Sequence, residues 1–158
     1  MAKKLGIIIS VIVVLFVALY FALQYKNNKA LEDNPYGKTD LHQLTIDQLN
    51  DPLYDNQILP DELLDLVESG EPITVYFYSP DCIYCTQTTP YLVPLAEEMN
   101  VDMKKLNLLE FYQEAGPFQI NSTPTLIHYE NGEEVARLEG QYPEEQYEEF
   151  FNEYVLKN

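Results

Sequence analysis

Two cysteines separated by two residues, Cys82 and Cys85, follow directly on a run of β-branched and aromatic residues. That run, residues 73–78, lies between two prolines and is typical of a central strand buried on both faces. Apolar residues at helical spacing then continue to about Met99. The sequence therefore predicts a strand, a turn and a helix, with Cys82 at the helix N-terminus and Cys85 one turn further on.

This placement predicts reactive cysteines. A helix N-terminus carries roughly half a positive charge and free N–H groups, and both favour a thiolate. Because the thiolate is the nucleophile in disulfide exchange, we expect Cys82 to have a lowered pKa and to attack client disulfides. The i, i+3 spacing lets Cys85 reach the same sulfur and resolve the mixed disulfide. The two residues are therefore the candidate catalytic pair.

Two other interpretations of the cysteines are a pair of buried, reduced thiols and half of a zinc site. A zinc site would need two more ligands, but the chain contains only His42 and His128, and neither has a ligand-like spacing. His128 falls in a predicted strand, where a packed or edge residue is expected. The sequence predicts neither a metal nor a cofactor.

Strand and helix patterns alternate through the rest of the chain. A helix is predicted to begin at Pro60, with acids in its first turn, and to end at Gly70. Pro90 lies inside the cysteine helix and should kink it. The other predicted elements are a possible short strand at 56–59, strands at 101–107, 126–129 and 135–139, and helices at 109–115 and 143–156. An Asn-Gly hairpin turn joins the last two strands. The predicted class is α/β, a mixed central sheet with helices on both faces.

The N-terminal region is almost entirely apolar from Leu5 to Leu23. A helix of about 20 apolar residues crosses the hydrocarbon core of a bilayer. Tyr20 and Tyr25 lie where aromatic rings favour the headgroup boundary, and two lysines follow. We therefore predict a short stub at residues 1–4, one transmembrane helix at 5–25 in contact with membrane lipid, a polar tether at 26–54 and a globular domain at 55–158.

Two alternatives for the apolar run are a cleaved signal peptide and a buried core helix. The run is longer than the apolar region of a usual signal peptide, about 7–15 residues, and no small-x-small cleavage pair follows it. A helix buried in the protein core would have a polar face, and this run has none. Lysines on both sides nearly cancel the positive-inside signal. A short N-terminal stub usually leaves the domain outside, so the prediction is a single-pass cell-membrane protein with an extracytoplasmic domain.

The charge distribution excludes one class of partner. All 26 acidic residues lie at or beyond Glu32, whereas four of the nine basic residues lie before Ala30. A strongly acidic body repels phosphate backbones, so nucleic-acid binding is not expected. The acid excess is typical of a solvated surface, and no motif indicates a binding face for basic clients.

The segment from Val75 to Cys85 resembles the active-site stretch of thioredoxins, and the likeness extends over roughly residues 58–155. Thioredoxins have a proline five residues after the second cysteine, where Pro90 stands. They also have a cis-proline facing the cysteine pair, and Thr123-Pro124 matches it. The resemblance implies a thioredoxin fold, a structural role for Pro90 and substrate binding by Thr123 and Pro124. It also implies activity on protein or peptide thiols and disulfides, together with a redox partner protein.

The chain departs from the thioredoxin pattern at two positions. Tyr76 replaces a buried aspartate that helps to deprotonate the second cysteine, and a phenol is a poor base at neutral pH. Asp81 replaces the usual tryptophan and should oppose thiolate formation at Cys82 to a modest extent. Tyr84, between the two cysteines at the helix end, is expected to contact clients. Tyr76 and Tyr78 could line a client groove, although core packing is expected for at least one of them.

Three functions fit these features. The prediction is an extracytoplasmic thiol–disulfide oxidoreductase acting on exported proteins. The first alternative is a dedicated accessory protein for a secreted peptide, similar to the thioredoxin-like bacteriocin-transport accessory proteins. The second is a non-catalytic thioredoxin-fold binding module whose cysteines form a structural bridge. The dipeptide Ile83-Tyr84 matches neither reducing thioredoxins nor strong oxidases, so the direction of electron flow stays open among oxidase, reductase and isomerase.

Overall fold

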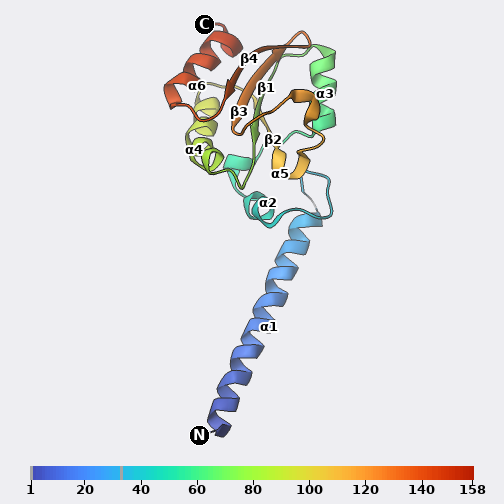
Figure 1. Ribbon diagram of the computed structural model, residues 1–158, viewed down its shortest axis with the longest axis vertical. Coiled ribbons are helices and arrows are strands. Elements are labelled where there is room, and N and C mark those ends of the chain that lie inside the picture. Colours follow the sequence, from blue (N-terminus) through green and yellow to red (C-terminus); the bar gives the residue numbers. More distant parts are fainter. Residues whose placement is uncertain (1, 33) are drawn as a thin grey trace. The chain divides into compact units, whose positions relative to one another are not determined.

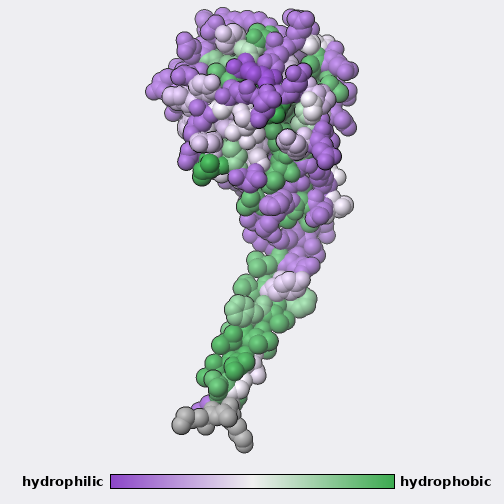
Figure 2. Space-filling view, viewed as in Figure 1, coloured by the Kyte–Doolittle hydropathy of each residue, from purple (hydrophilic) through white to green (hydrophobic). Residues whose placement is uncertain are grey.

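The N-terminal part of the chain is one long helix. The structure, a computed structural model, describes residues 2–32 and 34–158 and divides into two units after Asp40. In the first unit, helix α1 spans Ala2–Glu32. Its apolar stretch, Lys4–Lys29, is long enough to cross a membrane, and none of its described side chains is buried. Figure 2 shows the hydrophobic surface that these side chains form along α1. The helix is therefore a candidate membrane span, although a signal sequence has the same properties.

The second unit contains a mixed sheet between helices. Its strands are β1 (Ile73–Tyr78), β2 (Met103–Asn107), β3 (Thr125–Glu130) and β4 (Glu133–Glu139). The order across the sheet is β2-β1-β3-β4, with β2 parallel to β1 and the other neighbours antiparallel. The helices are α2 (Gln43–Gln48), α3 (Pro60–Ser69), α4 (Ile83–Glu98), α5 (Leu108–Phe111) and α6 (Glu144–Phe150). Two short 3₁₀ turns, η1 (Pro52–Tyr54) and η2 (Gly116–Phe118), and a π-helical segment, η3 (Phe151–Leu156), complete the unit. Helices α4 and α6 lie on one side of the sheet and α3 and α5 on the other (Figure 1), so the predicted fold class is confirmed.

Strand β1 is the centre of the core, with all six residues buried. Successive side chains point to opposite faces of a strand. Tyr76 and Tyr78 therefore share one face, where their rings stack with centroids 5.8 Å apart among residues of α4 and α6. Phe77 packs on Phe118 on the other face, at 5.6 Å. Both tyrosines are core residues and do not line a client groove.

Two glycine-dependent turns support this arrangement. Helix α3 ends at Gly70, whose φ of 82° is left-handed and whose N–H donates to the Val67 carbonyl at 3.0 Å. The Asn131-Gly132 pair has φ values of 54° and 83° and joins β3 to β4, as the sequence predicts. The two turns also contact each other, because the Asn131 N–H donates to the Gly70 carbonyl at 3.1 Å.

The compact unit begins earlier than the predicted domain. It starts at Leu41, which is buried, so α2 and η1 of the predicted tether pack into it. Thr45 is fully buried and accepts a hydrogen bond from the Asn107 amide at 3.2 Å. Asp55 pairs with the buried Lys105 ammonium at 3.0 Å. These contacts are made by isolated residues in a mostly polar segment, without helical or strand periodicity. The sequence pattern therefore indicated a tether.

The short strand predicted at residues 56–59 is reduced to one bridge. Gln57 pairs with Lys105 in a parallel bridge, and the Ile58 N–H donates to the Lys105 carbonyl at 2.9 Å. The segment therefore lies along the β2 edge of the sheet without extending as a strand.

We predict that Gly70→Ala lowers the free energy of unfolding by about 1 kcal/mol, because an L side chain disfavours a left-handed φ. The measurement is thermal unfolding of the full chain in detergent, followed by the near-ultraviolet circular dichroism of the tyrosines. Gly116→Ala is the matched control: its φ is not positive and nothing lies within 4 Å of the added carbon. Equal shifts of the melting temperature in the two variants would show that the left-handed backbone at Gly70 is not the cause of the destabilisation.

Candidate active site

Cys82 lies at the start of α4. The chain turns after β1, where the Cys82 N–H donates to the Ser79 carbonyl at 3.1 Å. Cys82 is then the N-cap of the helix, with extended backbone angles, and its Sγ accepts the Cys85 N–H at 3.3 Å. A sulfur thus occupies the place of the hydroxyl or carboxylate that usually caps a helix. The structure places Cys82 at the helix N-terminus and Cys85 within the first turn.

The surroundings of Cys82 favour the thiolate. Partial burial alone would raise the pKa of this thiol, but hydrogen bonds from the side chains of Cys85 and Thr123 and from the N–H groups of Cys85 and Tyr84 outweigh it. The net result is a pKa below the ordinary value for cysteine. In the thiol form, Sγ donates to the Thr123 carbonyl at 3.3 Å. Half-buried and easily ionised, Cys82 has the properties of a nucleophile.

Cys85 has the opposite character. It is 1% exposed and belongs to the core cluster behind α4. Burial raises the pKa of its thiol to about 12, and the hydrogen bond with Cys82 acts in the same direction. Both cysteines are free thiols in this structure. The pair therefore combines an accessible, acidic thiol with a buried one that stays protonated.

Thr123 and Pro124 lie against the cysteine pair. Their peptide bond is cis, and the Thr123 carbonyl is the group 3.3 Å from Cys82 Sγ. Pro124 is buried, and its carbonyl accepts the Gly140 N–H at 2.7 Å, which ties this loop to the end of β4. The fold thus brings four of the predicted site residues together.

The two other predicted site residues, Tyr84 and Pro90, both lie on α4. Tyr84 is 56% exposed at the first turn of α4, next to both cysteines, and its neighbour Ile83 is 62% exposed. Pro90 lies inside α4, where its missing N–H removes the helical hydrogen bond to the Thr86 carbonyl. Tyr84 is thus accessible to a client, while Pro90 belongs to the helix that carries the cysteines.

A hydroxyl pair behind Cys85 takes the place of a buried acid. The Thr89 hydroxyl donates to the Cys85 carbonyl at 2.8 Å and lies 3.2 Å from the Tyr76 hydroxyl. Because the single Thr89 hydrogen is already used, Tyr76 must be the donor and hence protonated. Burial, the largest cause, holds the pKa of Tyr76 well above its ordinary value. Sequence reasoning missed Thr89, although a threonine four residues after Cys85 is the known signal for such a backbone contact.

A pocket of about 400 Å³ opens beside Thr123. Its wall comes from the turn before Cys82, from α5 and from the loop that leads to the cis-proline. The lining residues are Ser79, Asp81, Leu108, Leu109, Tyr112, Ile120, Asn121, Ser122 and Thr123. Sequence analysis did not identify this pocket, because its walls meet only in the folded sheet.

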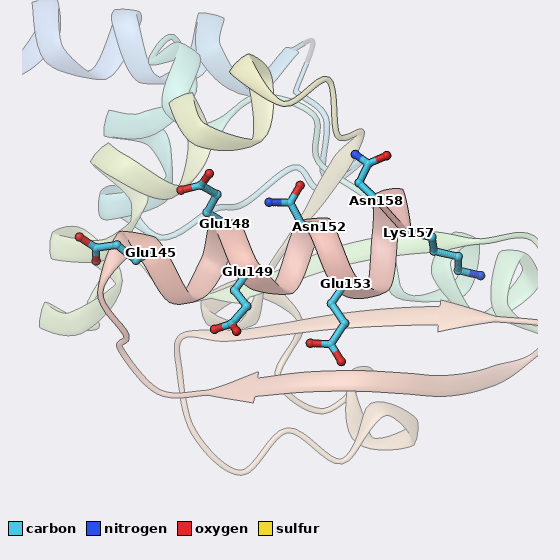
Figure 3. Close-up of a pocket in the computed structure, with 7 residues that line it drawn as sticks. All are labelled: Glu145, Glu148, Glu149, Asn152, Glu153, Lys157 and Asn158. Atoms are coloured by element: carbon cyan, nitrogen blue, oxygen red, sulfur yellow. The ribbon is translucent and has the colours of Figure 1, made fainter.

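A second pocket lies on the C-terminal helix. Figure 3 shows its lining, which includes Glu145, Glu148, Glu149 and Glu153 and comes from α6, η3 and the two residues after them. Lys157, also in this lining, pairs with Glu130 at the end of β3 opposite the cis-proline. This acidic surface is therefore separate from the cysteines.

The two histidines have local structural partners. His42 Nδ1 accepts the Leu44 N–H at 3.3 Å and caps α2. His128 is buried between the Thr74 hydroxyl, at 2.9 Å, and the Glu130 carboxylate, at 3.1 Å. Among the described residues, no group of three or more histidines, cysteines and acids has a metal-binding arrangement.

Comparison with known proteins agrees with this geometry. The family model described as Thioredoxin matches residues 57–153, more than half of the chain. Thioredoxin from Chlamydia pneumoniae is 34% identical over 85 residues, which are 53% of this chain and 83% of that protein. Thioredoxin from Haemophilus influenzae is 33% identical over 92 residues, covering 57% and 86% of the two chains.

Solved structures show the same fold. A point mutant of thioredoxin from Halobacterium salinarum aligns with a TM-score of 0.53 at 24% identity, over 63% of this chain and 87% of that one. Thioredoxin from Aeropyrum pernix aligns with a TM-score of 0.50 at 25% identity, over 61% and 83%. The chain therefore belongs to the thioredoxin family and is a thiol–disulfide oxidoreductase, with a Cys-x-x-Cys pair at Cys82 and Cys85.

Proposed function

We propose that this protein is anchored in the cell membrane by α1 and exchanges disulfides with exported proteins, with Cys82 as nucleophile and Cys85 as resolving thiol. The observation that carries the proposal is the contrast between the two thiols. One turn of helix separates a cysteine of lowered pKa from a buried cysteine whose pKa is about 12. A structural bridge or an inert binding module would have no need of this contrast.

The reductive direction has two steps. The Cys82 thiolate attacks one sulfur of the client disulfide, forms a mixed disulfide and releases the other client sulfur as a thiolate. Cys85 then loses its proton and attacks Cys82 Sγ. A Cys82–Cys85 disulfide forms, the second client thiolate leaves, and two electrons have passed to the client. Oxidation of a client follows the same steps in reverse, and a partner thiol or disulfide protein resets the pair.

The order of these steps follows from how the thiols affect each other. Burial is the main cause of the raised pKa of Cys85, and Cys82 adds to it through a hydrogen bond and through its charge. The two effects of Cys82 are lost when it is held in a mixed disulfide, so the pKa of Cys85 falls at that stage. Tyr76 is a phenol and cannot take the proton of Cys85 as a carboxylate would. The fall in the pKa of Cys85 therefore promotes the deprotonation that a buried aspartate promotes in thioredoxins. Capture of a client by Cys82 thus makes Cys85 easier to ionise.

The membrane part of the proposal is supported by α1. Its exposed apolar stretch is long enough to span a bilayer, and it precedes the region that matches the family. We propose that the domain faces outward from this membrane. In that compartment the clients would be exported proteins, whose disulfides need formation or correction.

We predict that iodoacetamide modifies Cys82 at least about 100-fold faster than Cys85 in the reduced, folded protein at pH 8. The reaction requires a thiolate, and the pKa of Cys82 is lowered while that of Cys85 is raised. Quantitative mass spectrometry of the two alkylated sites measures the ratio. In the unfolded protein the ratio should approach one, and equal labelling in the folded protein would contradict the proposal.

We predict that Cys82→Ser abolishes thiol-dependent reduction of insulin, whereas Cys85→Ser accumulates mixed disulfides with clients because the resolving thiol is missing. Non-reducing electrophoresis detects these complexes, and dithiothreitol should release them. The double variant serves as the control and should capture nothing. Sustained turnover by Cys85→Ser would show that a single thiol is sufficient.

We predict that the full chain stays in the membrane fraction after carbonate extraction, and that protease added to intact cells degrades the domain. A variant lacking residues 2–32 should leave the membrane fraction. A shortened, soluble form of the unaltered chain would identify residues 5–25 as a cleaved signal. Survival of the domain in protease-treated cells would place it in the cytoplasm.

A further inference from the structure

The pocket beside Thr123 has a chemically distinctive lining. Leu108, Leu109, Tyr112 and Ile120 make much of its wall apolar, and Tyr112 is 75% exposed. Among the lining residues that the structure describes, Asp81 contributes the one charged side chain. Its carboxylate accepts a hydrogen bond from the Ser79 hydroxyl, which is itself mostly buried and restrains the carboxylate. The pocket is therefore partly apolar, with an exposed carboxylate at its edge.

This pocket adjoins the reacting sulfur. Asp81 immediately precedes Cys82, and Thr123 lines the pocket while its carbonyl lies 3.3 Å from Cys82 Sγ. A client whose sulfur reaches Cys82 must place the residues next to its own cysteine near this opening. The pocket thus lies where it can contact a side chain that flanks the client cysteine.

We infer that this pocket selects clients with a lysine or arginine next to the reacting cysteine, whose cation pairs with Asp81 while its methylene stem packs on Leu109 and Tyr112. Long basic side chains bury their stems on apolar surface and keep their charged end near water, which matches this combination. The acid excess of the domain attracts the same clients over longer distance. The inference rests on the proposed function, since it names the clients of the same cysteine pair.

The test uses the full chain in detergent and three peptide disulfides that differ in one residue beside the cysteine: lysine, its uncharged analogue norleucine, or glutamate. At low salt we expect kcat/KM to be about three- to tenfold higher for the lysine peptide than for the norleucine peptide, with the glutamate peptide lowest. Asp81→Asn should bring the lysine-to-norleucine ratio close to one, and about 0.5 M salt should reduce it in the unaltered protein.

Glu149→Gln is the matched control, because it removes one exposed acid from the surface in Figure 3, away from the cysteines. It should leave the ratio unchanged. Equal rates for the lysine and norleucine peptides, or a ratio that Asp81→Asn leaves intact, would overturn the inference. An equal loss in both variants would do so as well, because it would assign the preference to net charge. Turnover of the norleucine peptide by the unaltered protein tests the oxidoreductase function separately, since only failure with every peptide contradicts that function.

Discussion

The helix cap at Cys82, where Sγ accepts the Cys85 N–H and is also hydrogen-bonded by the Cys85 and Thr123 side chains, is the feature on which the chemistry of this protein depends. It exists because β1 is buried on both faces and therefore delivers the chain to a fixed point at the start of α4. At that point the helix has unpaired N–H donors, and a sulfur meets them at the position of the cap. The same turn of helix draws Cys85 into the core. One backbone geometry thus produces two thiols of opposite acidity.

Much of the fold and the centre of the site can be predicted from the chain alone. Residues 73–78 predict a buried strand because β-branched and aromatic residues are continuous there, and the cysteine spacing then places both sulfurs. Gly70 and Asn131-Gly132 predict their turns because only certain residues tolerate a left-handed backbone. In each case the cause is local, so a short window of sequence contains it.

The remaining features depend on contacts between distant segments. Thr45 and Asn107 are 62 residues apart, and nothing in either local pattern indicates that they bond. The pocket beside Thr123 likewise combines the turn before Cys82, α5 and the loop before Pro124. Tyr76 could be compared with the aspartate of related proteins, but its contact with the Thr89 hydroxyl could not be inferred from the sequence. Such properties require the tertiary structure.

The anchors at the start of the compact unit bear on how a soluble fragment should be designed. A recombinant fragment cut where the family match begins, at residue 57, would lose both Thr45 and Asp55. The Asn107 amide would then lack its partner in the protein interior, and the ammonium of Lys105, 3% exposed, would lose its counter-charge. Each loss costs on the order of 1–3 kcal/mol, a large share of the stability of a small domain. A soluble fragment for crystallisation or spectroscopy should therefore begin at Leu41, upstream of the region that matches the family.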